Sequence, residues 1–261
     1  MASSLARGDL EGGAAGAGAR PDGDCELGEL AALAGIGMTV PICPGQTIVI
    51  EGDTISHCFR IVSGTVRLYK AIADGRRQVI DFLGAGDCFG LTGLERHGYS
   101  AEAISPVTLI RYSRPTIEAA SHGNAKLAQA LFRLACSELD RAQQQMLLLG
   151  RKSADEKIAS FLLGLAARNE RKGGQHPREP IVHLPMSRQD IADYLGLTIE
   201  TVSRTLSRFR RLGLIDLLGR QHVALRRTGR LRKLADGLVS EMPDPLRFDR
   251  QAADDAIEAL A

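Results

Sequence analysis

The sequence predicts an α+β protein with three structural parts: an N-terminal antiparallel β-roll, a long central helix and a C-terminal winged helix-turn-helix. Three observations support this fold class. Short β-branched and aromatic runs interrupted by glycines occupy residues 44–113, as in closely spaced strands. An apolar repeat of helical period follows over residues 124–149. Two short helical segments with N-cap residues lie on either side of Gly196.

The first part should be an antiparallel roll over residues 41–123. Its predicted strands are the runs TIVI, FRIVSG, TVRLYK, RQVIDFL and VTLIRYS, which are apolar or alternate between apolar and polar residues. Residues 1–40 should be a mostly disordered extension, because residues 1–24 are rich in glycine, alanine and serine and show no periodicity. Residues 25–40 are compatible with one short helix.

Residues 124–150 are the clearest long helix of the sequence. Apolar residues recur there in alternating steps of four and three, which is the a/d seam of a coiled coil. Charged residues lie outside the seam, so we expect two copies of the chain to pair along it as a parallel homodimer. The alternative is a single amphipathic helix that covers only its own domain. The seam consists of Ala128, Phe132, Ala135, Leu139, Ala142, Met146 and Leu149.

The C-terminal part, residues 151–237, should be a winged helix-turn-helix domain. Gly150 is expected to end the long helix, and residues 150–152 to form the hinge before a helix opened by a Ser153–Glu156 capping box. An exposed loop over 168–180, a short strand IVHLP, the helix-turn-helix, a wing hairpin of LIDLL and HVAL and a basic helix TGRLRKLADGL should follow. Residues 238–261 form an acidic tail.

The helix-turn-helix prediction rests on caps, turn and periodicity. Ser187 and Thr198 are good N-caps, Gly196 interrupts the two helices and Gly213 ends the second one. One face of the second helix is apolar and carries Val202, Leu206 and Phe209. The opposite face suits base edges and phosphates better than a protein core, although an αα-hairpin with a solvated charged face is the alternative. This face carries Glu200, Ser203, Arg204, Ser207, Arg208 and Arg211.

The net charge of +2 conceals a strong segregation along the chain. Residues 151–237 carry 18 Lys/Arg against 9 Asp/Glu, whereas residues 1–150 carry 13 against 16 and residues 238–261 carry 2 against 6. One basic segment between two mildly acidic ones is typical of a DNA-binding module, and here the positive charge coincides with the helix-turn-helix.

Other classes of protein lack support in the sequence. No apolar stretch reaches the roughly 18 residues of a membrane helix and no signal peptide opens the chain, so a cytoplasmic location without membrane contact is expected. His57, His97 and His122 are isolated, unlike the clustered ligands of a cupin metal site. No nucleophile elbow or P-loop occurs, so we expect no enzymatic activity.

The segment SRQDIADYLGLTIETVSRTLSRF closely resembles the DNA-reading unit of the CRP/FNR transcription regulators. The resemblance covers roughly residues 40–230, and its most specific part is the run from Glu200 to Arg204, an E-x-x-S-R pattern. Ile199 stands where the cyclic-AMP receptor protein has an arginine, which is similar to the FNR/FixK branch. The resemblance implies a cyclic-nucleotide-binding-like β-roll, a homodimer and a transcription regulator, usually an activator, that contacts double-stranded DNA and RNA polymerase.

The resemblance also implies roles for individual side chains. Glu200, Ser203 and Arg204 should read bases, with an FNR-type inverted repeat of TTGAT and ATCAA as the target. Side chains near the helix starts and at the end of the second helix should hold phosphates. These are Ser187, Gln189, Thr198, Thr201, Arg208, Arg210 and Arg211.

The resemblance leaves the role of the roll open. Where nucleotide-binding relatives have a Gly-Glu pair and a phosphate-binding arginine, this chain has Gly86-Asp87 and Tyr99-Ser100. We therefore expect a roll that binds no nucleotide and has a structural role only, and we expect no cofactor. Only Cys25 precedes Pro41, unlike the N-terminal cysteine cluster of FNR, so no iron–sulfur cluster is expected. The alternatives are a regulator gated by a cyclic nucleotide, haem or another effector in the roll, and a constitutive repressor.

Overall fold

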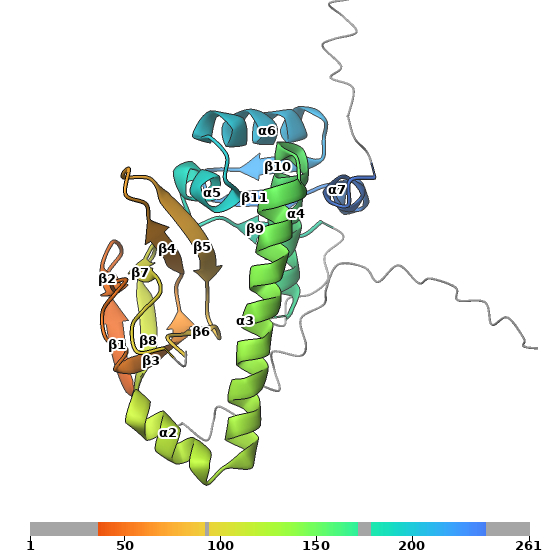
Figure 1. Cartoon of the computed structure of the whole chain (residues 1–261). Coiled ribbons are helices and arrows are strands. Elements are labelled where there is room, and N and C mark those ends of the chain that lie inside the picture. Colours follow the sequence, from red (N-terminus) through yellow and green to blue (C-terminus); the bar gives the residue numbers. More distant parts are fainter. Residues whose placement is uncertain (1–35, 92–93, 172–178, 239–261) are drawn as a thin grey trace, which may run out of the picture.

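The computed structural model describes residues 36–91, 94–171 and 179–238 (Figure 1). The expectations for the extension over 1–35, for the loop over 172–178 and for the tail over 239–261 lie outside the described residues. The predicted α+β fold class is confirmed. Two four-stranded antiparallel sheets, a long helix and a helix-turn-helix with a three-stranded sheet follow one another along the chain.

The eight strands of the roll form two sheets that share one apolar core. The sheets have the orders β1-β8-β3-β6 and β2-β7-β4-β5. Alternate side chains of both sheets point inward, so that Ile61, Val66 and Leu109 are completely buried between them. The strands are β1 (Met38–Ile42), β2 (Thr47–Val49), β3 (His57–Ser63), β4 (Val66–Ala71), β5 (Arg77–Leu83), β6 (Cys88–Phe89), β7 (Ser100–Ala103) and β8 (Val107–Ser113).

The start of the roll corrects one expectation. Residues 25–40 are compatible with a short helix in the sequence, but Met38–Ile42 form strand β1, which pairs antiparallel with β8. The β-branched residues Thr39, Val40 and Ile42 favour an extended backbone. Pro41 is tolerated because β1 is an edge strand, where one side of the backbone needs no partner strand. The roll therefore begins before residue 41.

Three helices follow the roll: α2 (Arg114–His122), α3 (Ala125–Arg151) and α4 (Ala154–Arg171). Gly150 does not end α3 as expected. The helix continues to Arg151, and the backbone becomes extended only at Lys152. A glycine inside a helix costs only about 1 kcal/mol relative to alanine, which a helix of 27 residues can tolerate. The predicted exposed loop over 168–180 is also shortened, because α4 extends to Arg171.

The chain direction changes at a capping box, as predicted. The backbone N–H of Ser153 donates to Glu156 Oε2 at 3.2 Å, and the N–H of Glu156 donates to Ser153 Oγ at 3.4 Å. Among the described helices, none is both long enough and apolar enough to cross a bilayer.

The C-terminal part contains β9 (Ile181–His183), α5 (Arg188–Leu195), α6 (Ile199–Arg211), β10 (Ile215–Leu218), β11 (His222–Leu225) and α7 (Thr228–Ala235). Strands β10 and β11 form the predicted wing hairpin, and β9 pairs with β11 on its other side. The apolar core of this part extends into the roll, because Val79 and Phe82 of β5 belong to the same cluster. The rings of Phe82 and Tyr194 lie 5.4 Å apart, so the roll and the helix-turn-helix are packed directly against each other.

Candidate nucleic-acid interface

The two helices of the helix-turn-helix are built as their cap residues predict. The Ser187 hydroxyl accepts the N–H of Asp190, and the Asp190 carboxylate accepts the N–H of Ser187, which completes a capping box at the start of α5. Gly196 ends α5 with a left-handed φ of 60°, and a Cβ at this position would lie 3.3 Å from Leu149 on α3. Thr198 then caps α6, since its hydroxyl accepts the N–H of Thr201 at 3.2 Å.

Helix α6 has the two faces that the sequence predicts. Val202, Leu206 and Phe209 are almost completely buried against the rest of the domain. Thr205, a polar residue that apolar periodicity does not predict as part of the core, is buried on the same face. The remaining positions form a basic outer face, on which all side chains except the half-buried Thr201 and Arg208 are exposed. Because the inner face is anchored by the core, the outer side chains are held on a rigid element.

The three candidate base-reading residues lie together on this outer face. Glu200, Ser203 and Arg204 are all exposed. The backbone N–H of Glu200 itself, the Thr198 hydroxyl and the charge of Arg204 lower the pKa of Glu200, so its carboxylate is an acceptor at neutral pH. An open groove of about 600 Å³ runs along α6, and it is lined by Thr201, Ser203, Arg204, Thr205, Ser207, Arg208 and Arg211.

The candidate phosphate-binding side chains at the helix starts already have partners within the chain. The single hydroxyl proton of Ser187 goes to Asp190 at 2.7 Å, so a phosphate contact from this hydroxyl requires that bond to be exchanged. Gln189 donates one amide proton to Asp193 at 2.6 Å and keeps a second one. The hydroxyls of Thr198 and Thr201 lie 3.0 Å apart and are bonded to each other.

The three candidate arginines at the end of α6 differ in their surroundings. Arg210 and Arg211 are exposed. Arg208 is half-buried and forms an ion pair with Asp155 of α4. Its side chain therefore shares its charge between the protein and any phosphate beside the helix.

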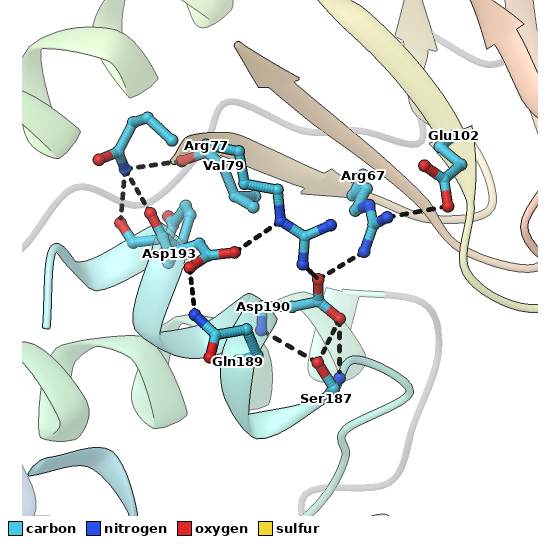
Figure 2. A network of polar contacts seen from close by, with 10 residues as sticks. Arg67, Arg77, Val79, Glu102, Ser187, Gln189, Asp190 and Asp193 are labelled. Carbon is cyan, nitrogen blue, oxygen red and sulfur yellow. Dashed lines mark hydrogen bonds and ion pairs between the residues drawn. The ribbon is translucent and has the colours of Figure 1, made fainter. Parts of the chain in front are cut away.

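A polar network that the sequence analysis missed joins α5 to the roll (Figure 2). Arg67 and Arg77 of the β4–β5 hairpin both donate to Oδ1 of Asp190 at 2.6 Å, and Arg77 also donates to Asp193 at 2.6 Å. Burial by itself raises the pKa of the Asp190 carboxyl, but the bonds from Ser187 and the charges of both arginines outweigh burial and lower this pKa. Asp190 is thus a buried, ionised anchor between the roll and the helix-turn-helix.

The predicted seam on α3 is exposed in the protomer. Phe132, Leu139 and Met146 lie seven residues apart and are 70%, 60% and 64% exposed. Ala128, Ala135 and Ala142 of the same stripe are also exposed, whereas Leu149 is half-buried near the turn at Gly196. Leu127 and Ala130 are buried instead, and Leu127 packs in a core cluster with Cys58 and Tyr112 of the roll. The helix therefore covers its own domain with one side and presents a second apolar side to solvent.

The four described cysteines do not form a metal site, and no group of three or more metal-ligating side chains occurs among the described residues. Cys43 and Cys136 are exposed, while Cys58 and Cys88 are buried beside Tyr112 and Ile117. Burial raises the pKa of the Cys58 thiol to about 11 and that of the Cys88 thiol to about 12.

Alkylation of the folded protein at pH 8 should therefore separate the two kinds of cysteine. We expect iodoacetamide to modify Cys43 and Cys136 quickly and to leave Cys58 and Cys88 unmodified, because only the thiolate reacts and buried thiols stay protonated. Peptide mass spectrometry measures each site, and denatured protein, in which all five thiols of the chain should react, Cys25 included, is the control. Rapid labelling of Cys58 in the folded chain would contradict the described core.

Comparison with known proteins agrees with this architecture. Residues 39–122 match the cyclic nucleotide-binding domain family and residues 156–234 match the Crp-like helix-turn-helix domain family. The nitrogen fixation regulation protein FixK of Azorhizobium caulinodans is 44% identical over 202 residues, which cover 77% of this chain and 81% of that protein. The transcriptional activator protein FnrL of Cereibacter sphaeroides is 36% identical over 208 residues, which cover 79% of this chain and 84% of that protein.

A solved structure shows the same similarity in three dimensions. FixK2 from Bradyrhizobium japonicum superimposes with a TM-score of 0.71 at 37% sequence identity, over 76% of this chain and 97% of that one. These relatives are transcription regulators and not enzymes, in agreement with the exposed basic face of α6 and with the expectation from the sequence. The chain belongs to the CRP/FNR family of transcription regulators, as a FixK-like member with a helix-turn-helix for DNA binding.

Proposed function

We propose that the protein binds an inverted repeat of TTGAT and ATCAA as a homodimer and activates transcription from nearby promoters. The observation that carries the base code is the joint exposure of Glu200, Ser203 and Arg204 on the anchored helix α6. A carboxylate accepts from the N4 amine of cytosine, and an arginine donates to O6 and N7 of guanine. Ser203, on the same exposed face, discriminates the adjacent base pair.

Phosphate contacts should supply most of the affinity. Arg208, Arg210 and Arg211 extend the basic face of α6 beyond the base-reading residues. Ser187, Gln189, Thr198 and Thr201 lie at the N-terminal ends of α5 and α6, where backbone N–H groups and the helix dipole favour a phosphate. Each neutralised phosphate steepens the salt dependence of binding.

The exposed seam on α3 supports the homodimer. Three large apolar side chains at seven-residue intervals lose their contact with water when two α3 helices pair, as in a coiled coil. Two helix-turn-helix units related by a two-fold axis would then face the two halves of an inverted repeat, about one helical turn apart.

Contact with RNA polymerase is proposed as the route to activation. The name of the relative FnrL describes a transcriptional activator, and the same outcome is inferred for this chain. A repressor that only blocks the promoter is the alternative. Transcription in vitro with purified polymerase and a promoter that carries the repeat separates the two, since added protein should raise transcript yield if the proposal holds and lower it if the alternative does.

The interior of the roll argues against gating by a cyclic nucleotide. The Tyr99 hydroxyl accepts the N–H of Gly90 at 3.0 Å, and the Ser100 hydroxyl accepts the N–H of Glu51 at 3.0 Å. Arg96 donates to the carbonyl of Gly52 at 2.7 Å. These groups, which occupy or neighbour the positions expected for a phosphate cradle, are therefore engaged within the protein.

The charges nearby also disfavour a phosphate. Burial raises the pKa of Glu138, and the carboxylates of Asp81 and Asp87 add to this rise, while Arg141 opposes it. A phosphodiester placed here would approach the carboxylates of Asp81 and Asp87, and the neighbouring Arg141 is already paired with Asp81 at 3.4 Å.

DNA binding without any added ligand is the corresponding prediction. Protein purified without a nucleotide should bind the repeat with a Kd of about 10⁻⁸ M or lower at physiological salt. Cyclic AMP or cyclic GMP in large excess should leave this Kd unchanged, because Arg96, Tyr99 and Ser100 are already bonded within the described part of the roll. Fluorescence anisotropy of a labelled duplex measures the Kd, and a duplex with scrambled half-sites is the control. Tighter binding on addition of a cyclic nucleotide would support the effector-gated alternative instead.

A further inference from the structure

Two arginines of the roll hold the first helix of the helix-turn-helix, and we infer that this contact sets the spacing of the two recognition helices on DNA. Arg67, Arg77, Asp190 and Asp193 are called the arginine clamp below. The inference deepens the proposed function and rests on it, because helix spacing has a meaning only in a DNA-bound dimer. Arg67 and Arg77 are positioning residues, which act through α5 and α6.

Both arms of the clamp originate from one hairpin of the roll. Arg67 on β4 donates from Nη1 to Asp190 Oδ1 at 2.6 Å and from Nη2 to Glu102 on the neighbouring strand β7 at 2.8 Å. Arg77 at the start of β5 donates from Nη2 to the same Asp190 oxygen at 2.6 Å (Figure 2). Asp190 is only 4% exposed, so its carboxylate depends on these partners.

A second contact fixes the rotation of α5 about its own axis. Arg77 also donates from Nε to Asp193 Oδ2 at 2.6 Å, so one guanidinium binds two carboxylates that lie about one helical turn apart. A single ion pair would hold the polar face of α5 at one point, whereas two ion pairs hold it at two points about one turn apart.

The end of α5 is held from two sides as well. Gln78 of β5 donates to the carbonyl of Asp193 at 2.6 Å, and Gln145 of α3 donates to the carbonyl of Tyr194 at 2.8 Å. Carbonyls in the last turn of a helix have no partner within that helix, so these amides satisfy them. Helix α5 is thus bracketed between the roll and α3.

These contacts on two sides of α5 determine the direction of the recognition helix α6. Only the turn from Gly196 to Thr198 separates α5 from α6, and Gly196 itself approaches Leu149 of α3. Helix α3 carries the seam of the proposed dimer. An orientation of α6 that is fixed relative to α3 is therefore fixed relative to the two-fold axis, and so is the separation of the two α6 helices.

A clamp that only stabilises the fold would behave differently. Loss of stability reduces the concentration of active protein and weakens binding to every operator by the same factor. Loss of positioning reduces the penalty for a wrong spacing, because a loosely held helix-turn-helix can follow a displaced half-site. One added or removed base pair shifts a half-site by about 3.4 Å and rotates it by roughly 35°. The spacing preference therefore separates the two roles.

The test compares two double variants of the same hairpin. Arg67→Met with Arg77→Met removes the clamp and keeps the apolar stems. Lys70→Met with Arg76→Met removes the same charge from exposed residues, whose ion-pair partners among the described residues are Glu51 and Asp74 and do not belong to α5. Kd values are measured by fluorescence anisotropy for the best operator and for the same half-sites one base pair closer and one base pair further apart. All proteins are assayed where circular dichroism shows them folded.

We expect the wild type and the Lys70/Arg76 variant to lose about tenfold or more in affinity at either wrong spacing, similar to the cost of a mismatched base pair. The Arg67/Arg77 variant should bind the best operator about tenfold more weakly and should discriminate between spacings by less than about threefold. Unchanged spacing discrimination in the Arg67/Arg77 variant would overturn the inference, whatever happens to its melting temperature.

Hydrogen exchange without DNA keeps the clamp testable if the proposed function fails. In the Arg67/Arg77 variant, amides of α5 and of the Lys152–Ser153 connection should exchange faster than in the Lys70/Arg76 variant, while amides of the roll core should not. If the wild type binds no operator, the proposed function is wrong, and faster exchange still establishes the clamp. Equal exchange in both variants would refute the clamp independently of DNA.

Discussion

Replacing Leu139 by glutamate should convert the protein to a monomer and abolish specific operator binding. Leu139 lies at the centre of the exposed apolar seam, between Phe132 and Met146. In a paired α3 helix, two carboxylates would face each other in a desolvated position, at a cost of several kcal/mol. Each monomer then contacts one half-site only, and its affinity should fall towards the non-specific level, about 10³-fold or more. Sedimentation gives the mass and fluorescence anisotropy the affinity.

Leu147→Glu is the matched control for this experiment. Leu147 is 65% exposed, similar to Leu139, but the heptad period places it outside the seam. This variant should remain dimeric and keep its affinity for the operator. A Leu139→Glu protein that stays dimeric and fully active would show that α3 packs only against its own domain.

The features predicted correctly from the sequence are those that depend on neighbouring residues. Helix α6 was predicted because Val202, Leu206 and Phe209 repeat at helical spacing and Thr198 is a good cap. The exposed stripe on α3 was predicted because a heptad repeat needs no knowledge of the rest of the fold. Caps, turns and amphipathic periods are local signals, and the structure confirms them at these positions.

The features missed by the sequence analysis depend on distant residues. Arg67 and Asp190 are 123 positions apart, and nothing in the alternation of β4 indicates which helix faces its outer side. Strand β7, SAEA, contains two alanines of low β propensity, and pairing with β2 and β4 overrides that preference. Tertiary contacts decide both of these cases. Gly150 is expected to end α3, but the helix continues to Arg151 and is followed by the extended residue Lys152.

Removing the Arg204 side chain should cost about 1–3 kcal/mol of binding free energy. It should also reduce the preference for guanine over other bases at one position of each half-site. The loss is sequence-specific, because a bidentate arginine contacts O6 and N7 of guanine only. Arg211→Ala is the comparison within the same helix. It should weaken binding to all duplexes alike. It should also make the slope of log K against log salt concentration less steep, by about one for each lost phosphate contact. Kd values at two salt concentrations, on the repeat and on a guanine-substituted duplex, measure both effects.

Ile199→Arg combined with Ser203→Gly should change the preferred half-site from TTGAT to TGTGA. Both positions are exposed at the start of α6, so the new side chains fit without disturbing the buried face formed by Val202 and Leu206. The added guanidinium supplies a second donor for guanine, and the smaller residue removes the contact that discriminates the adjacent pair. Selection from randomised duplexes measures the preference of the wild type and of the double variant in parallel. If the wild type enriches a motif without a TTGAT core, the assignment of Glu200, Ser203 and Arg204 as the base-reading residues is wrong.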